Sequence, residues 1–200
     1  MSYAIIGFGQ VGQALAGMFA RKGIEVAVAT TRPPEAIADK AREIGATVVA
    51  KSLSDAITAD IVLLAVPFWS HRDVAKAAPD WAGKTIIDVT NAYGFTPEEM
   101  DNLPASVVVA KAFNGAKLVK AFNHLAAPVL AKDPAVNGGR RVIFFSSDDD
   151  EGATKPVVEL IEKLGFAPVS LGTVSDGGTL VQARGKTWGP LNFQDLVKFE

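Results

Sequence analysis

The sequence predicts a single-domain α/β fold built on a doubly wound, mainly parallel sheet of about eight strands. Short apolar runs typical of buried strands alternate along the chain with segments whose apolar residues recur at helical spacing. A glycine-rich run follows the first strand directly. No linker or shift in composition divides residues 1–200, and this length is within the usual size of one domain. The expected strands are Tyr3–Ile6, Ile24–Ala29, Thr47–Val49, Asp60–Val66, Lys84–Val89, Lys117–Phe122, Arg141–Phe145 and Phe166–Leu171.

The glycine-rich run has the form Gly-x-Gly-x-x-Gly and lies between the first strand and a helix that ends near Gly23. In that setting the motif indicates a Rossmann-type dinucleotide site. The first glycine allows a tight turn, the second lets the backbone approach a pyrophosphate, and the third lets helix and strand pack closely. The pyrophosphate then faces free N–H groups of the helix, where the macrodipole favours negative charge. The expected cofactor-binding residues of this loop are Gly7, Phe8, Gly9, Gln10, Val11 and Gly12.

The end of the second strand predicts which dinucleotide is bound. An acidic residue at this place holds the ribose 2′-hydroxyl of NAD and repels a 2′-phosphate. Here Thr30, Thr31 and Arg32 occupy it, and the first carboxylate comes only at Glu35. Arginine forms bidentate, charge-assisted bonds with phosphate, and threonine hydroxyls can donate to its oxygens. A solvated loop with a surface arginine explains Arg32 but not the missing acid, so we expect NADP(H).

The loops after the fourth, fifth and sixth strands are candidates for the nicotinamide half, because ligands bind outside the carboxyl ends of such strands. The loop after the fourth strand is apolar and includes Trp69, which suits an aromatic ring; local core packing is the alternative for its rings. Asn91 either reaches a carboxamide or ribose or only caps a turn. The further cofactor-binding residues expected here are Val66, Pro67, Phe68, His71, Asn91 and Asn123.

The sequence has two histidines. His124 follows the sixth strand and is the candidate catalytic residue, as a proton donor to a reduced acceptor. Contact with solvent at a helix N-terminus is the alternative for this side chain. His71 is expected to be structural or to lie beside the ribose. The acidic run Asp148–Glu151 is explained by favourable charge at a helix start, so we expect no metal site.

Among the expected helices are Leu53–Ala59, capped by Ser52 or Ser54, and His124–Leu130, which is followed by a loop over Asp133–Gly139. Residues 173–200 are expected to form a C-terminal helix and an apolar tail that helps form the acceptor site or a homodimer contact. Packing of the tail back onto the sheet is the alternative. The apolar tail residues are Trp188, Leu191 and Phe193.

The composition argues against several classes of function. Twenty basic and 22 acidic residues leave a formal net charge of −2, so no global field attracts nucleic acid. No apolar run approaches the ~20 residues of a membrane span, and no basic-then-apolar leader precedes the first strand. We therefore expect a cytoplasmic protein without nucleic-acid or membrane partners. The absence of cysteine excludes disulfides, cysteine-ligated zinc and thiol nucleophiles.

The chain has five motifs in this order: the glycine run, Thr30-Thr31-Arg32, Val66-Pro67-Phe68, Asp88-Val89-Thr90-Asn91 and Lys120-Ala121-Phe122-Asn123. In their order and spacing, these motifs resemble the coenzyme F420-dependent NADP oxidoreductases and the cytosolic reductase domain of STEAP-type metalloreductases. The resemblance extends over essentially the whole chain and implies a Rossmann domain that passes a hydride between NADP(H) and a deazaflavin or flavin. It places the pyrophosphate at Phe8 to Gly12, the 2′-phosphate at Thr30 to Arg32, and the nicotinamide beside Val66, Pro67, Phe68, Asn123 and His124.

We therefore expect an oxidoreductase that transfers a hydride between NADPH and coenzyme F420, a flavin or another small-molecule acceptor. Such a transfer depends on stacking and water exclusion more than on side-chain chemistry. Roughly thirty residues follow the last strand, too few for a separate substrate domain. The deazaflavin enzymes are expected to have a His-Thr-Ile-Pro-like segment where this chain has Asn123-His124-Leu125-Ala126, so the second cofactor stays open. Two alternatives are a redox sensor that binds NADP(H) without turnover and a small carbonyl or imine reductase that uses His124.

Overall fold

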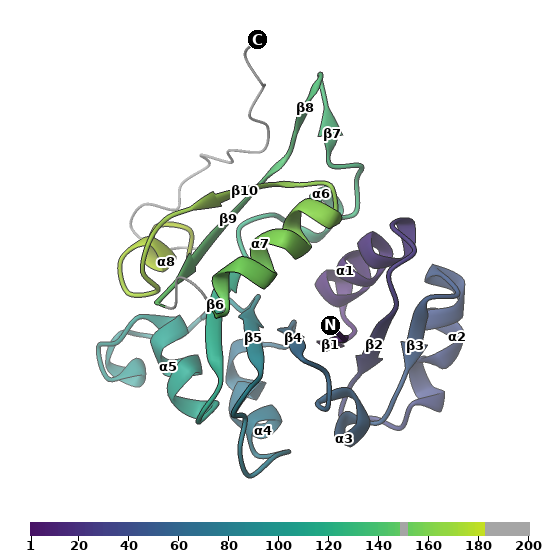
Figure 1. Cartoon of the computed structure of the whole chain (residues 1–200). Helices are drawn as coiled ribbons and strands as arrows, with labels where there is room; N and C mark the ends of the chain where they lie inside the picture. The colour runs from purple at the N-terminus through teal and green to yellow at the C-terminus, as the bar shows by residue number, and fades with distance from the viewer. Residues whose placement is uncertain (149–151, 183–200) are drawn as a thin grey trace.

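Eight strands form the central sheet of the computed structural model, which describes residues 1–148 and 152–182. They are β1 (Tyr3–Ile6), β2 (Val26–Ala29), β3 (Val48–Ala50), β4 (Ile61–Leu64), β5 (Thr85–Asp88), β6 (Lys117–Ala121), β9 (Val142–Ser147) and β10 (Ala167–Ser170). Their order across the sheet is β10-β9-β6-β5-β4-β1-β2-β3 (Figure 1). Neighbours run parallel except β6 and β9, which pair antiparallel. The predicted doubly wound, mainly parallel Rossmann-type sheet is confirmed.

Helices connect the strands and cover both faces of the sheet (Figure 1). They are α1 (Gln10–Arg21), α2 (Glu35–Ile44), α3 (Leu53–Ala56), α4 (His71–Ala75), α5 (Ala105–Ala112), α6 (Ala127–Leu130), α7 (Thr154–Lys163) and α8 (Gly177–Leu180), with 3-10 turns η1 (Phe68–Ser70) and η2 (Glu98–Met100). Helices α1, α2, α6 and α7 pack in one apolar core, and α3, α4 and α5 pack in the other. Successive strand residues point to opposite faces, so Leu63 joins the first core and Leu64 the second.

The direction of the strand order reverses between β1 and β4, which lie side by side in the middle of the sheet. The chain leaves β1 through α1 toward β2 on one side, and leaves β4 through η1 and α4 toward β5 on the other. Open α/β sheets bind ligands at the carboxyl ends of the strands at this reversal. Because β5 and β6 run parallel to β4, their following loops reach the same edge.

The predicted helix His124–Leu130 is wrong in its first turn, because α6 begins only at Ala127. Pro128 stands in the first turn of α6, where its missing N–H costs nothing. A helix begun at His124 would bring the Pro128 ring against the carbonyl group four residues earlier. His124 therefore lies in the loop between β6 and α6 and not at a helix N-terminus.

The predicted helix Leu53–Ala59 is shorter in the structure, ending at Ala56. Its predicted cap is confirmed, because Ser52 Oγ accepts a hydrogen bond from the backbone N–H of Asp55 at 3.1 Å. The hydroxyl also donates to the Asp55 carboxylate at 2.6 Å. This cap determines where the helix starts. Its last residue, Ala56, packs in the second core.

The predicted loop over Asp133–Gly139 instead contains a hairpin, in which β7 (Ala135–Val136) pairs antiparallel with β8 (Gly139–Arg140). Its two-residue turn has positive φ angles at both positions, 48° at Asn137 and 80° at Gly138. Two such residues define a type I′ turn, for which Asn-Gly is a preferred sequence. The Asn-Gly pair was therefore the available signal for this hairpin.

The predicted acidic helix start, Asp148–Glu151, is described only at Asp148, and α7 begins at Thr154. Asp148 Oδ1 accepts a hydrogen bond from the backbone N–H of Val174 at 3.0 Å. None of the helices within residues 1–148 and 152–182 is long and apolar enough to cross a membrane. The predicted contact residues of the tail lie outside the described residues: Trp188, Leu191 and Phe193.

Candidate functional site

The glycine loop after β1 packs so closely on its surroundings that two of its glycines admit no side chain. Gly7 has a φ of 102°, and a Cβ there would lie 2.3 Å from the carbonyl oxygen of Ala65. A Cβ at Gly12 would lie 2.0 Å from the carbonyl oxygen of Gly7. These contacts support the predicted roles of the first and third glycines, which are the tight turn and the close packing of α1 on β1.

Gly9 differs from the other two glycines because its Cβ position is open. It is the N-cap residue of α1, with a φ of −76°, and no atom lies within 4 Å of an added Cβ. The first turn of α1 has no acidic residue, so nothing there repels an anion from the positive end of the helix dipole. Gln13 Nε2 donates to the Phe8 carbonyl oxygen at 2.9 Å and steadies the loop. The loop therefore fits the pyrophosphate of a dinucleotide.

The segment after β2 lies directly beside this loop, because the Gly7 N–H donates to the Ala29 carbonyl oxygen at 2.8 Å. Thr30 Oγ1 accepts a hydrogen bond from the Arg32 backbone N–H at 3.1 Å and so shapes the turn. Thr31 and Arg32 are exposed. Among the described residues, no carboxylate lies within ion-pair distance of the Arg32 guanidinium. This cation is therefore available to a ligand phosphate next to the glycine loop.

The loop after β4 presents different side chains from those that the sequence predicts. Val66 is half-buried and Pro67 is exposed, but Phe68 is buried, with its ring 4.9 Å from that of His71 and 5.0 Å from that of Phe95. The Phe68 ring therefore packs in the core beneath the loop, in agreement with the alternative of local core packing. Trp69 points the other way and is 63% exposed, so it supplies the flat apolar surface at this position.

Asn91 and Asn123 come from the ends of β5 and β6 and meet, as the sequence predicts for two residues of one site. Asn91 Nδ2 donates to the Asn123 carbonyl oxygen at 2.9 Å, and Asn123 Nδ2 donates to Asn91 Oδ1 at 3.2 Å. Asn123 Nδ2 also donates to the carbonyl oxygen of Val181 at 3.0 Å, just after α8. Asn123 Oδ1 is buried without a hydrogen-bond partner, which leaves it free to accept an N–H or O–H from a ligand.

His124 is buried beside these residues, and its ring lies 5.2 Å from that of Phe144. Its Nε2 lies 3.3 Å from the carbonyl oxygen of Val142, and because a carbonyl only accepts, Nε2 must hold the proton. Nδ1 is buried without a partner. Burial lowers the pKa of His124 from 6.5 to about 4. The side chain is therefore neutral near pH 7, and its N–H is already engaged by the backbone.

An ion pair buried next to the two asparagines was not identified from the sequence. Lys120 and Asp88 face each other across β6 and β5, and Lys120 Nζ lies 3.1 Å from Asp88 Oδ2. Ser106 Oγ donates to the same carboxylate oxygen at 2.8 Å, and Thr90 donates to the other one. Burial lowers the pKa of Lys120, and the Asp88 carboxylate opposes that shift. The signal was an aspartate and a lysine at the ends of two strands whose central residues are apolar.

Large apolar side chains are exposed around this edge of the sheet. Trp69 follows β4 and is 63% exposed, Tyr93 follows β5 and is 46% exposed, and Leu180 of α8 is 48% exposed. Helix α8 approaches the sheet through Gly178, whose Cβ would lie 3.8 Å from Ser146 Cβ and 3.9 Å from Lys120 Cβ. Exposed apolar groups of this size are typical of contact sites. They follow the ends of neighbouring strands or lie in α8, as the Asn91–Asn123 pair and its Val181 partner do, and suit a flat, apolar ligand.

The family profile of NADP oxidoreductase, coenzyme F420-dependent, matches residues 2–92, from β1 to the loop after β5. The fold is similar to that of a protein from Arthrobacter sp. FB24 assigned as an F420-dependent NADP-reductase. The two chains are 26% identical with a TM-score of 0.72, and the match covers 87% of this chain and 86% of that one. Residues 2–92 of the chain thus match the coenzyme F420-dependent NADP oxidoreductase family. The predicted family is thus confirmed, and with it the broad class of NADP-dependent oxidoreductase.

Two further comparisons place the chain among known folds. A hypothetical protein from Sinorhizobium meliloti, SMa0349, is 40% identical with a TM-score of 0.89, over 100% of this chain and 96% of that one. A reductive aminase from Aspergillus terreus, solved with NADPH and ethyl levulinate, is 22% identical with a TM-score of 0.66 and shares the fold. The match covers 90% of this chain but 57% of the aminase. A search of curated proteins found no match.

Proposed function

We propose that the protein binds NADP(H) along the carboxyl edge of its sheet and exchanges a hydride with a planar redox acceptor of the deazaflavin or flavin type. The protonation state of His124 is the observation that favours this type of acceptor. With a pKa of about 4 and its N–H directed at Val142, His124 has no proton to donate near pH 7. A carbonyl or imine reductase needs such a donor beside the nicotinamide. Transfer between two redox rings depends mainly on their alignment and on the exclusion of water.

The glycine loop and Arg32 support NADP(H) as the dinucleotide. The open space at Gly9 and the uncapped start of α1 accommodate a pyrophosphate. The unpaired Arg32 beside the loop suits a 2′-phosphate, because guanidinium groups bind phosphate with two parallel hydrogen bonds. NADPH in the structurally similar aminase is consistent with this use of the fold.

The loops after β4, β5 and β6 receive the nicotinamide and the acceptor in this proposal. Asn123 Oδ1, buried and unpartnered, accepts an N–H of the carboxamide and so orients the ring. Trp69 and Tyr93 offer exposed aromatic faces against which the acceptor ring stacks. Bound NADPH supplies two electrons and one hydrogen as hydride, and the reduced acceptor takes any further proton from water. His124 keeps Val142 and Phe144 in place and stays neutral throughout.

The test is anaerobic NADPH oxidation with F420, FMN, FAD and ferric chelates offered in parallel, together with small carbonyls and imines. We expect a deazaflavin or flavin to support turnover, and we expect His124→Gln to retain the wild-type kcat. Turnover only with carbonyls or imines, abolished by His124→Gln, would favour the reductase alternative. Tight NADPH binding without turnover on any acceptor would instead favour a redox sensor.

A further inference from the structure

We propose that the furrow between α4 and α5 is an anion site that holds the phosphate or carboxylate tail of the acceptor. The acceptor's ring then lies at the carboxyl edge of the sheet, beside Trp69. This inference rests on the proposed function and narrows it to acceptors that combine a planar ring with an anionic tail. Neither the glycine loop nor Arg32 takes part in this second site.

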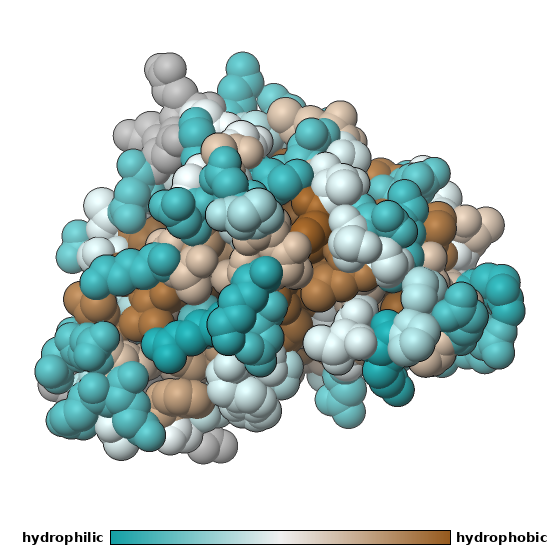
Figure 2. All heavy atoms as spheres, turned by 90° about the horizontal axis from the view of Figure 1, so that it is seen from below, coloured by the Kyte–Doolittle hydropathy of each residue, from teal (hydrophilic) through white to brown (hydrophobic). Residues whose placement is uncertain are grey.

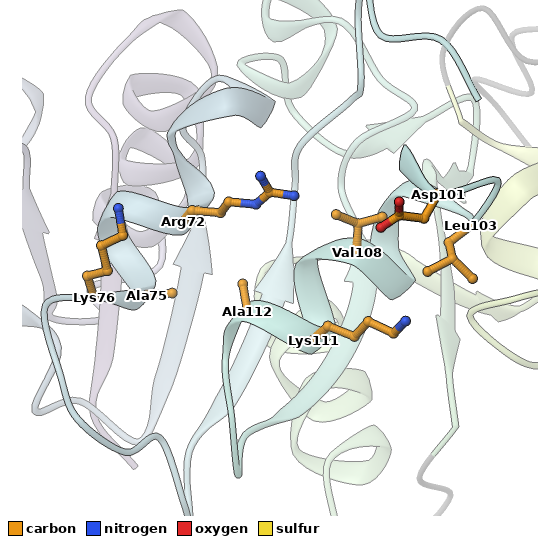
Figure 3. Close-up of a pocket in the computed structure, with 8 residues that line it drawn as sticks. All are labelled: Arg72, Ala75, Lys76, Asp101, Leu103, Val108, Lys111 and Ala112. Carbon is orange, nitrogen blue, oxygen red and sulfur yellow. The ribbon is translucent and has the colours of Figure 1, made fainter. Parts of the chain in front are cut away.

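Apolar and basic side chains line the furrow. It holds an open cavity of about 380 Å³ between the two helices, and Ala75 and Val108 are among its apolar lining residues. Seen from below, toward α3 and α4, apolar side chains show in furrows between hydrophilic ones (Figure 2). Arg72 extends from α4 toward the gap, and Lys111 lies on α5 across from it (Figure 3). Cavities of about 300–1,000 Å³ are the usual size for ligand sites.

The charge of the furrow is positive overall. Its lining includes the cations Arg72, Lys76 and Lys111 and a single acid, Asp101. Lys76 pairs with Asp73 at 3.2 Å, and both side chains are largely exposed, so this pair neutralises little. Among the described residues, neither Arg72 nor Lys111 forms an ion pair. Two cations beside apolar lining residues, without carboxylate partners, favour an anionic ligand.

A smaller cavity of about 130 Å³ continues the furrow to the carboxyl edge. Arg72 and Val108 line both cavities, and the smaller one is also lined by Phe68, Trp69, His71, Phe95 and Glu99. The Glu99 carboxylate accepts a hydrogen bond from the Thr96 backbone N–H at 2.8 Å. This volume is well below the ~300 Å³ at which ligand pockets begin, so it suits a narrow linker better than a ring. The path from Trp69 to Arg72 therefore leads from the proposed ring position to the cations.

His71 provides a polar contact along this path. Its Nδ1 bonds to the carbonyl oxygen of Phe68, which only accepts, so Nδ1 holds the proton and Nε2 has a free lone pair. Nε2 is buried and has no hydrogen-bond partner. An unpaired acceptor of this kind favours a ligand hydroxyl at the narrow point. Flavins and deazaflavins have such hydroxyls on the chain that joins the ring to the phosphate.

The experiment compares FMN with riboflavin, which differ only in the phosphate. Their Kd values are measured by flavin fluorescence with the full-length protein saturated with NADP⁺. We expect FMN to bind about tenfold more tightly than riboflavin at low salt, as for a charge-assisted bond. The difference should shrink at 1 M salt, where the screening length is about 3 Å. F420 and its tail-less ring analogue FO form a second pair that distinguishes a deazaflavin from a flavin.

Charge-neutral variants locate the effect. Arg72→Gln/Lys111→Gln should bring the FMN and riboflavin Kd values together without changing the NADPH Kd. The matched control, Lys155→Gln/Lys163→Gln, removes two exposed lysines from α7 on the other face of the sheet and should keep the FMN preference.

Asp101→Asn provides the opposite test, because it removes the acid that lines the larger cavity. The φ of Asp101 is 55°, and asparagine tolerates this left-handed conformation. The variant should bind FMN severalfold more tightly and leave the riboflavin Kd unchanged.

The inference is overturned if wild-type protein binds both members of each pair equally, if it binds none of the four, or if the double variant keeps the FMN preference. The NADPH Kd, measured without flavin, separates this failure from failure of the proposed function. Protein that binds NADPH and reduces acceptors without regard to their tails refutes the anion site alone. Protein that does not bind NADPH refutes the function itself.

Discussion

Lys120 Nζ lies 3.1 Å from Asp88 Oδ2 with both side chains buried, and the same ammonium group donates to the carbonyl oxygen of Thr90. The lysine comes from β6, and its two acceptors belong to β5 and the loop after it. The pair therefore ties together the two loops that present Asn91 and Asn123. It thereby helps to hold Asn91 and Asn123 within hydrogen-bond distance of each other.

Lys120→Met should destabilise the fold by about 3–5 kcal/mol, because it leaves the Asp88 carboxylate buried without a counter-charge. The double variant Lys120→Met/Asp88→Asn should be more stable than the sum of the single losses predicts. Urea unfolding of the two single variants and the double variant measures this coupling. Strictly additive losses would show that the two side chains do not act as a pair.

Buried His124 should make the protein sensitive to acid. Its folded pKa of about 4 lies below the ordinary value of 6.5, so between these pH values the unfolded chain binds a proton that the folded chain does not. The stability from neutral His124 is complete above pH 6.5 and is lost as the pH falls toward 4. Between pH 7.5 and 5.0 this loss is about 2 kcal/mol. His124→Gln should remove that part of the pH dependence, as measured by urea unfolding at the two pH values.

Phe122 has a buried ring and a φ of 61°, a left-handed conformation in which a side chain is strained. This turn directs the chain from β6 to Asn123. Phe122→Gly should therefore be more stable than Phe122→Ala by about 1 kcal/mol, since glycine adopts this φ without strain. At buried Phe19, inside α1, the order should reverse by about the same amount, because glycine is the poorer helix former. Thermal unfolding of the four variants measures both differences. If the glycine variant were the more stable, or the less stable, at both sites, the argument from the φ of Phe122 would be contradicted.

Arg32→Ala tests the assignment of the 2′-phosphate. The variant should bind NADPH more weakly by about 1.5–3 kcal/mol, the range of a hydrogen bond to a charged group, and should bind NADH as the wild type does. Isothermal titration of both nucleotides measures the difference. Equal losses for NADPH and NADH would place the 2′-phosphate elsewhere.

Local patterns in the sequence were sufficient to predict most of the fold. The glycine run, the apolar strands and the carboxyl-edge loops are specified by spacing and by residue type over short stretches. The convergence of Asn91 and Asn123 also followed from the sequence, because parallel strands bring their ends to one edge of the sheet. The NADP(H)-binding roles of these residues stay predictions until nucleotide binding is measured.

Features that depend on packing between distant segments did not follow from the sequence. The inward orientation of the Phe68 ring depends on Phe95, which lies 27 positions later in the chain and contacts this ring. The burial of His124 depends on Val142 and Phe144 of an antiparallel strand, whose direction has no local signal. The Asn137-Gly138 hairpin is a different case, because Asn-Gly is itself a local signal for the type I′ turn seen here.

The most direct test of NADP(H) use at this edge is the NADPH Kd and single-turnover oxidation of Gly9→Ala. An added Cβ at Gly9 meets no atom within 4 Å, so the variant should keep the wild-type melting temperature. It should bind NADPH at least about tenfold more weakly, because the methyl group takes the space of the pyrophosphate. Gly12→Ala is the matched control and should unfold more easily, since its Cβ would lie 2.0 Å from the Gly7 carbonyl oxygen. Wild-type NADPH binding and turnover in a normally folded Gly9→Ala would contradict the account.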